Sequence, residues 1–249
     1  MAAAGAIHTE VMQQLASLVE PGVTTLELDT VAERMILDAG AVPSFKGYPG
    51  PQHPRPFPGS ICASPDSMVV HGIPNRQPLL EGSIISIDVG VTLDGWVADG
   101  AFTFAVGQID PVAEALLATT RRSLDHAVAA CQVGGRLGDI SNAVQQTVEA
   151  DGFGVVRTLV GHGVGRSMHE DPQIPNYGPA GKGPRLEPGM VFAIEPMTTV
   201  GHPDVYEGDD HWAIYSRDGS LAAHFEYTVA ITGDGPWILT PWHEGPGAL

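Results

Sequence analysis

The feature that constrains the fold most is a short pattern that occurs twice along the chain. Gly82 is followed six residues later by Asp88, and Gly189 is followed six residues later by Glu195. In both copies the intervening residues are mostly apolar, and the acidic residue ends the run. A Val-His-Gly-Ile stretch at 70–73 is likewise similar to Gly-His-Gly-Val at 161–164. We therefore predict two related α/β halves that share one core and bring their acidic residues face to face.

The apolar periodicity predicts the same element order in both halves, which we place at about 1–110 and 111–249. Expected helices cover 2–19, 25–39, 111–133 and 139–150, with N-caps at Thr25 and Asp139. Expected strands of the first half cover 61–63, 68–71, 84–91 and 96–106, the last two forming a hairpin. A second antiparallel sheet is expected from 190–196, 212–215 and 222–232. The proline- and glycine-rich stretches 43–58 and 172–185 predict loops.

The composition excludes several classes of protein. A chain of 249 residues with 43% hydrophobic and 16% charged residues fits a soluble globular protein with an ample core. The net charge of -17 argues against a nucleic-acid-binding surface and against anionic membranes. Two cysteines provide no disulfide framework or zinc-finger spacing. Residues 1–21 lack the basic start of a secretory signal, and no apolar run is long enough to span a membrane. We expect a cytoplasmic monomer.

Four acidic residues lie in or at the end of apolar strands. Asp88 and Asp99 flank the hairpin turn, so they can lie on adjacent strands and face the same way. Glu195 closes its own strand, and Glu226 lies within an apolar stretch. A charged carboxylate in a core strand is costly unless it is paired or binds a metal. The chain has two lysines, and its arginines fall mostly in predicted helices or loops. These acids therefore indicate bound cations.

Two histidines, His162 and His169, flank a glycine-rich segment directly after an apolar run. The glycines allow a tight bend that can direct both imidazoles into one cavity. With His162 the four acids make five candidate ligands, which is more than one metal ion needs. Because carboxylates can bridge, two divalent ions about 3.5–4 Å apart are the natural interpretation. Oxygen ligands with one imidazole suit Mn, Fe or Co and do not exclude Zn.

Six short motifs together resemble type I methionine aminopeptidases, which belong to the pita-bread metallopeptidases. They are Val-His-Gly-Ile-Pro at 70–74, Ser-Ile-Asp-Val at 86–89, Asp-Gly-Trp-Val-Ala-Asp at 94–99, Gly-His-Gly-Val-Gly at 161–165, Ala-Ile-Glu-Pro-Met at 193–197 and Phe-Glu-Tyr-Thr-Val at 225–229. The resemblance extends from about residue 4 to residue 239. It implies a single catalytic domain over 1–249 with the α/β (α+β) pita-bread fold, in which helices lie outside antiparallel sheets. It also implies removal of the initiator methionine from peptides and nascent proteins.

The resemblance also implies a role for each matching residue. The ligands of two divalent metal ions, whether Co, Mn, Fe or Zn, would be Asp88, Asp99, His162, Glu195 and Glu226. His71 and His169 would contact the substrate and stabilise the transition state, and Glu195 would transfer the proton of the attacking water. The methionine side-chain pocket would be formed by Tyr48, Phe57, Cys62, Met168 and Trp212.

The chain departs from the family pattern in three places. Eight residues separate Tyr48 from Phe57 where the family usually has two, so an insertion at 51–56 lies beside the expected pocket. Asp66-Ser67 replaces the usual Asn-Glu, and Tyr227 replaces the histidine of Phe-Glu-His-Thr. The metal ligands are unaffected, so hydrolysis is still expected, while strict methionine specificity is weakened.

Two alternatives remain at this stage. One is a pita-bread hydrolase with another substrate, either an Xaa-Pro dipeptidase or a specialised small-molecule enzyme. The other is a non-catalytic binding module, which would be expected to lose metal ligands that this chain retains.

Overall fold

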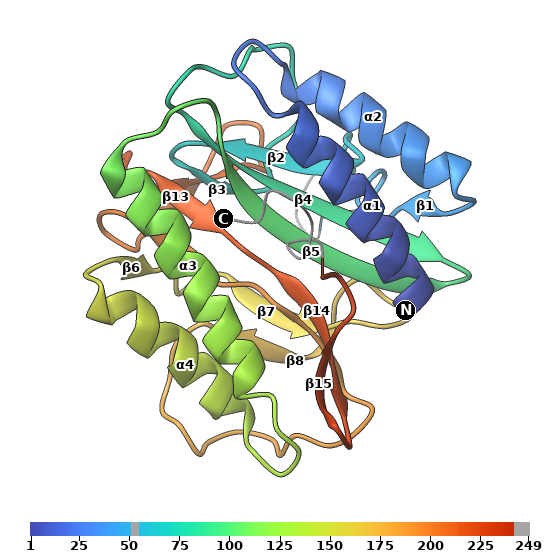
Figure 1. The fold of residues 1–249 in the computed structure, drawn as a ribbon, viewed down its shortest axis with the longest axis vertical. Coiled ribbons are helices and arrows are strands. Elements are labelled where there is room, and N and C mark those ends of the chain that lie inside the picture. Colours follow the sequence, from blue (N-terminus) through green and yellow to red (C-terminus); the bar gives the residue numbers. More distant parts are fainter. Residues whose placement is uncertain (51–54, 242–249) are drawn as a thin grey trace.

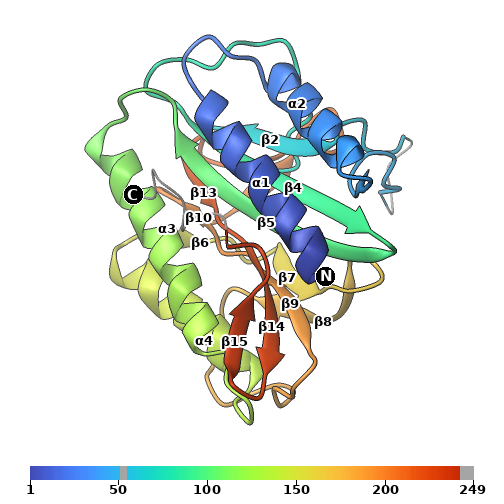
Figure 2. The ribbon, with the colours of Figure 1, turned by 45° about the vertical axis from the view of Figure 1, so that its right-hand side comes forward.

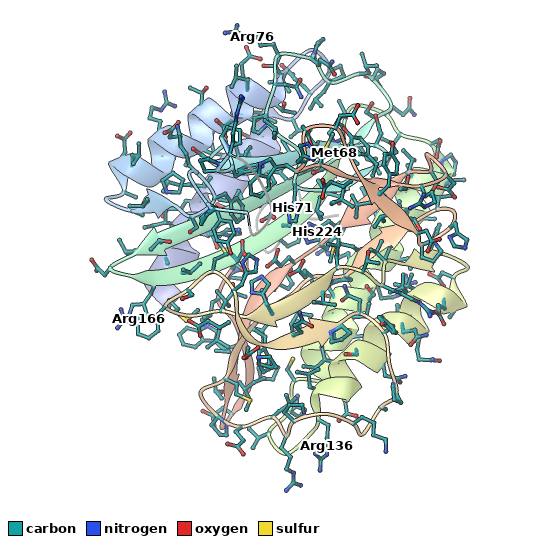
Figure 3. The ribbon with its side chains drawn as sticks, turned by 180° about the vertical axis from the view of Figure 1, so that it is seen from behind. Met68, His71, Arg76, Arg136, Arg166 and His224 are labelled. Carbon is teal, nitrogen blue, oxygen red and sulfur yellow. The ribbon has the colours of Figure 1, made fainter. Side chains whose placement is uncertain are left out.

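A computed structural model describes residues 1–50 and 55–241 of the chain. Within these residues, antiparallel strands form four sheets. The helices α1 to α4 all lie on the same side of the sheets, as Figures 1 and 2 show from two directions. The opposite side carries loops and the candidate site (Figure 3). None of the described helices is both long and apolar enough to cross a membrane.

The first half contains two helices that pack near a four-stranded sheet of order β1-β4-β2, with β5 paired to β4. The bounds are α1 Ala2–Leu18, α2 Thr25–Asp38, β1 Val42–Pro43, β2 Ile61–Pro65, β4 Ile84–Leu93 and β5 Trp96–Ala105. The predicted hairpin is present, with its turn at Asp94 and Gly95. The N-cap of α2 is Thr24 rather than Thr25, because the Thr24 side chain accepts a hydrogen bond from the Glu27 backbone at 3.2 Å.

The second half contains two helices and a five-stranded sheet of order β15-β14-β9-β7-β8. The bounds are α3 Pro111–Ala129, α4 Leu137–Ala150, β7 Val160–Gly163, β8 Glu170–Pro175, β9 Val191–Ile194, β14 Tyr227–Thr232 and β15 Gly235–Ile238. Helix α3 ends four residues earlier than predicted, before the left-handed Gly134. Asp139 is not the N-cap of α4. It lies in the first turn, where its carboxylate accepts a hydrogen bond from the Arg136 backbone at 2.7 Å.

The single second sheet expected from the sequence is wrong, because the predicted strands belong to three sheets. Two further sheets have the orders β13-β10-β6 and β11-β12-β3. Their bounds are β3 Met68–Val70, β6 Gly154–Val155, β10 Met197–Thr199, β11 Val205–Glu207, β12 Ile214–Ser216 and β13 Ala222–His224. The strands predicted over 190–196 and 222–232 are each interrupted at an acidic residue, Glu195 and Glu226. Pro196, which has no backbone donor, reinforces the first interruption.

The histidine segment follows the expected order, with a strand before the glycine-rich bend. His162 lies within strand β7, the bend follows it, and the register shifts between His162 and Gly163. The loop predicted over 172–185 begins inside β8, which pairs with β7. Strand β8 tolerates two prolines because it is the edge strand of its sheet.

The two halves meet where β5 passes the segment between β13 and β14. Phe102 packs edge-on against Phe225 and Tyr227, with ring centroids 5.4 and 5.3 Å apart. The backbones of Ala101 and Glu226 exchange hydrogen bonds, the shorter one measuring 2.7 Å. These contacts place a strand of the first half beside Glu226 of the second half.

Candidate active site

One cavity of about 490 Å³ receives residues from both halves, and His71, one of its lining residues, lies on the side of the sheets opposite the helices (Figure 3). Every residue that the sequence predicted for the site lines this cavity: Tyr48, Phe57, Cys62, His71, Asp88, Asp99, His162, Met168, His169, Glu195, Trp212 and Glu226. Residues from distant parts of the sequence therefore converge here. The lining also includes four residues that the sequence did not single out: Phe45, Leu159, Glu207 and Ile214.

The two aspartates of the first half face the cavity from the β4–β5 hairpin. Asp88 lies opposite Ala101, and Asp99 lies opposite Gly90. The two carboxylates are therefore diagonal neighbours on one face of the hairpin. The Asp99 backbone donates a hydrogen bond to Thr228 Oγ1 at 2.9 Å, and this hydroxyl donates to the Asp99 carbonyl at 2.8 Å. These bonds hold Asp99 beside the second half.

The second half contributes His162, Glu195 and Glu226. His162 Nε2 lies 3.5 Å from Glu195 Oε1 and 3.9 Å from Asp99 Oδ2. Asp99, His162 and Glu226, all buried, each offer a ligand atom within 4.8 Å of the others. The Glu195 backbone carbonyl accepts a hydrogen bond from Asn176 Nδ2 at 2.9 Å, which fixes the chain where it leaves β9.

Loss of solvation dominates the electrostatics of the cluster. It raises the pKa of Asp99 to about 7 and the pKa values of Asp88, Glu195 and Glu226 well above their ordinary range. Repulsion between the carboxylates adds to the rise for the latter three. Burial lowers the pKa of His162 to about 4, so its imidazole is neutral near pH 7. Added positive charge in the cluster would therefore favour the loss of these carboxyl protons at neutral pH.

The donor set fits divalent cations. Asp88 Oδ1 and Glu226 Oε1 are buried and have no hydrogen-bond partner among the described residues. The ion pairs of Asp99, Glu195 and Glu226 in this part of the chain involve histidines alone. His162 Nδ1 lies 2.9 Å from the Gly163 carbonyl and can donate to it. In that tautomer the lone pair of Nε2 faces the carboxylates, as a metal ligand requires.

His224 is a residue near the cluster that the sequence analysis missed. It lies on β13, is 2% exposed, and its Nε2 has no hydrogen-bond partner among the described residues. This nitrogen is 3.8 Å from Glu195 Oε2 and 3.7 Å from Glu226 Oε2. Burial lowers the pKa of His224 to about 3, and His71 adds to the effect. Figure 3 shows His71 and His224 close together. The sequence contained one indication of a role for His224. It lies two residues before Glu226, and in an extended chain two such residues lie on the same face.

His71 follows β3 in a strained backbone conformation. Its φ of 60° lies in the left-handed region, which is uncommon for residues other than glycine. The next residue must be glycine, because a Cβ on Gly72 would lie 2.1 Å from the Ala63 carbonyl oxygen. Hydrogen bonds from the Gly72 backbone to Ser64 Oγ and from the Ala63 backbone to the Gly72 carbonyl keep the chain in place. The strain is therefore maintained by its surroundings.

His169 lies at the end of a loop that is held in place by contacts of Glu170 and Arg166. Glu170 Oε1 accepts hydrogen bonds from the backbones of Arg166 and Ser167 at 2.7 and 2.8 Å. The Arg166 guanidinium lies 3.7 Å from the centroid of the Trp96 ring. The His169 ring contacts the His162 ring edge-on, with centroids 4.4 Å apart. Partial burial lowers the pKa of His169.

The apolar part of the cavity is built on an edge-on contact between Phe57 and Trp212, whose ring centroids are 5.1 Å apart. Cys62 and Met168 are buried beside it. Burial raises the pKa of the Cys62 thiol well above its ordinary value, so Cys62 serves as an apolar wall. Tyr48 and Phe57, which precede and follow the insertion in the sequence, lie side by side, because the Phe57 backbone donates to the Tyr48 carbonyl at 3.0 Å. Residues 51–54 of the insertion lie outside the described residues.

Buried acids and neutral imidazoles, gathered between two α/β halves beside an apolar pocket, define a metal-dependent hydrolase of the pita-bread class. A profile of metallopeptidase family M24 matches residues 1–233, and the chain therefore belongs to this family.

Relatives and solved structures agree with this membership. The methionine aminopeptidase of Clostridium perfringens is 49% identical over 96% of this chain and 94% of its own length. That of Mycobacterium tuberculosis is 46% identical over 96% of this chain and 91% of its own length. The crystal structure of methionine aminopeptidase from Thermotoga maritima superposes with a TM-score of 0.92 at 41% identity, covering 96% and 94% of the two chains. A prolidase from Pyrococcus furiosus shares the fold with a TM-score of 0.75 at 21% identity, covering 96% of this chain and 62% of its own.

Proposed function

We propose that this protein hydrolyses the N-terminal methionine from peptides and nascent proteins in a metal-dependent reaction. The observation that carries the proposal is the convergence of a carboxylate cluster and an apolar wall in one cavity. The peptide bond would bind at the carboxylate cluster. The first side chain would bind against the apolar wall, which consists of Phe57, Cys62, Met168 and Trp212. The methionine aminopeptidases that this chain resembles over 96% of its length support the assignment.

The metal site is proposed to hold two divalent ions, with Co, Mn, Fe and Zn as the candidates. Asp88, Asp99, His162, Glu195 and Glu226 would be the ligands, since four carboxylates exceed what one ion needs. The unpaired buried oxygens of Asp88 and Glu226 support this assignment. When bound, such ions lower the pKa of a water molecule and polarise a carbonyl.

The residues of the chain supply the proton transfer and hold the substrate. Glu195 has one carboxylate oxygen facing His162 and the other facing His224, so it lies within the cluster. It would accept the proton of the attacking water and return it to the leaving amine. His71 and His169 line the same cavity and would donate hydrogen bonds to the substrate carbonyl as its oxygen becomes negative.

The apolar wall accounts for a preference for methionine. A thioether is apolar and flexible, and it packs favourably against aromatic rings such as those of Phe57 and Trp212. Such a pocket distinguishes side chains of similar size by only about 1–3 kcal/mol. Side chains close in size to methionine should therefore be cleaved more slowly rather than rejected.

The chain is proposed to act as one catalytic domain made of two related halves, about 1–110 and 111–249. The candidate ligands come from both halves, so neither half carries a complete site. We further propose that the protein acts as a monomer in the cytoplasm on free N-termini. Its net charge of -17 makes nucleic acid an unsuitable partner.

A peptide panel tests the proposal. Metal-free protein is mixed with Mn, Co, Fe or Zn and given Met-Ala-Ser, Leu-Ala-Ser and Ala-Pro as substrates. Free methionine should appear only with metal, and faster than leucine. Cleavage of Ala-Pro alone would support a dipeptidase of the prolidase type instead. Metal binding without cleavage of any of these peptides would support a small-molecule enzyme or a binding module.

A further inference from the structure

We infer that Tyr48 is a positioning residue that selects the tautomer of His169, so that the Nε2 of this histidine carries the proton. The inference deepens the proposed function and rests on it for its catalytic consequence. Tyr48 would thus do more than line the side-chain pocket. Its hydroxyl would keep the proton on Nε2 of His169, and this N–H would donate a hydrogen bond to the substrate.

The contact between the two side chains is direct. The Tyr48 hydroxyl oxygen lies 2.6 Å from His169 Nδ1, and the two rings meet edge-on with centroids 5.4 Å apart. The residues are 121 positions apart and come from different halves of the molecule. Among the described residues, Tyr48 is the hydrogen-bond partner of His169. A distance of 2.6 Å is at the short end for a hydrogen bond, so the two groups are well placed.

Both partners are held from outside the contact. The Tyr48 backbone donates to the Phe45 carbonyl at 2.9 Å, and its carbonyl accepts from the Phe57 backbone at 3.0 Å. These two hydrogen bonds fix the backbone of Tyr48, and they therefore limit how far its hydroxyl can move. On the other side, Glu170 fastens the loop before His169, and the His162 ring contacts the His169 ring. Neither ring needs to move for the hydrogen bond to form.

The chemistry of the contact determines which nitrogen keeps the proton. A neutral imidazole has one N–H donor and one bare nitrogen, which is a good acceptor. A phenol is a better donor than acceptor, because the lone pairs of its oxygen are partly delocalised into the ring, so we take Tyr48 to donate its proton to the bare nitrogen. When Tyr48 donates to Nδ1, the proton of the imidazole must be on Nε2. An oxygen that becomes negative during hydrolysis needs such a donor, whereas a bare Nε2 would repel it.

Nuclear magnetic resonance of the metal-free protein tests the tautomer independently of activity. The variant Tyr48→Phe keeps the ring and removes only the hydroxyl. Tyr177→Phe is the matched control, because the Tyr177 ring packs under Arg157 and is not part of the cavity. In wild-type protein labelled with ¹⁵N-histidine, His169 Nε2 should give the signal of a protonated nitrogen. In Tyr48→Phe the signals of both nitrogens should move toward each other, and in Tyr177→Phe they should not change. A proton on Nδ1 in the wild type would overturn the inference.

Kinetics on Met-Ala-Ser with metal-loaded protein test the catalytic consequence. One neutral hydrogen bond shifts an equilibrium by about 2- to 10-fold, so kcat of Tyr48→Phe should fall by about that factor with KM nearly unchanged. The same substitution in a His169→Ala background should change kcat by less than about twofold, because the residue on which Tyr48 acts is gone. An equal loss of kcat in both backgrounds would overturn the positioning role, as would a rise in KM alone.

The two measurements separate this inference from the proposed function. A wild-type protein that releases no methionine with any metal would contradict the proposed function. The tautomer of His169 would then still be decided by the nitrogen signals of the wild type and Tyr48→Phe.

Discussion

The variant Asp99→Asn should stabilise the metal-free protein at neutral and alkaline pH while it removes one of the proposed metal ligands. The pKa of Asp99 rises from 3.8 to about 7 in the folded protein, mainly because the group is buried. Between these two values the folded state binds more protons than the unfolded state. The unfolding free energy of the metal-free wild type therefore falls as pH rises through this window. Asparagine is neutral at every pH and does not contribute this loss.

The size of the effect follows from the shift. About three pKa units at 1.36 kcal/mol each give a gain of at most about 4 kcal/mol for Asp99→Asn above pH 7. At about pH 5 the gain is roughly 1.6 kcal/mol, because only somewhat more than a third of the window has been crossed. The asparagine amide can donate to Asp88, which already shares a hydrogen bond with Asp99. Any fixed cost of burying the amide cancels between the two pH values.

Urea unfolding of protein treated with a chelator measures the difference. Asp99→Asn should gain about 2.5 kcal/mol more at pH 8 than at pH 5. Adding saturating metal should reverse the order of stability, because only the wild type has all five proposed ligands. Asp139→Asn is a control of opposite sign. The pKa of Asp139 is lowered by hydrogen bonds from the Gly181 and Arg136 backbones, so this variant should lose stability at neutral pH. A gain for Asp99→Asn that is the same at both pH values would refute the reasoning.

Three further variants separate the roles within the cavity. His169→Ala should keep its metal and lose about 10²–10³ in kcat, measured beside metal content, and a parallel loss of metal would make His169 a ligand instead. Glu226→Ala should lose at least one metal equivalent and nearly all turnover, and full occupancy by elemental analysis would contradict its place among the ligands. Phe57→Ala should bind metal normally and reduce the preference for Met-Ala-Ser over Leu-Ala-Ser, because it removes half of the contact with Trp212. An unchanged preference would show that the side chain binds elsewhere.

Much of the fold follows from local patterns. The apolar alternation before Asp88 and the turn at Asp94 and Gly95 define the hairpin, and the structure contains it. The helices also appear where the periodicity places them, with errors of at most four residues at their ends. Helix ends depend on which side chain reaches a backbone donor. Local sequence alone therefore did not separate Thr24 from Thr25 as the cap.

The sheets of the second half could not be predicted, because pairing between distant strands decides them. Two of the acids that mark the site, Glu195 and Glu226, lie in the breaks that separate β9 from β10 and β13 from β14. A sequence pattern shows an apolar run with an acid in it, but not that the backbone leaves one sheet for another at that residue.

The acidic residues of the candidate site were easier to predict than the residues and contacts around them. Buried carboxylates without basic partners are conspicuous in a sequence, since few other circumstances permit them. His224 has no such signal apart from its spacing to Glu226. The hydrogen bond between Tyr48 and His169 joins two loops of different halves, and no local pattern reports such a contact.

The most direct test of the dinuclear site is anomalous diffraction from crystals grown with manganese. Two anomalous peaks about 3.5–4 Å apart are expected between the two halves. Asp88, Asp99, His162, Glu195 and Glu226, which line one cavity, would be the residues that hold the ions. A single peak, or peaks outside this cluster in a protein that releases methionine, would contradict the proposed centre.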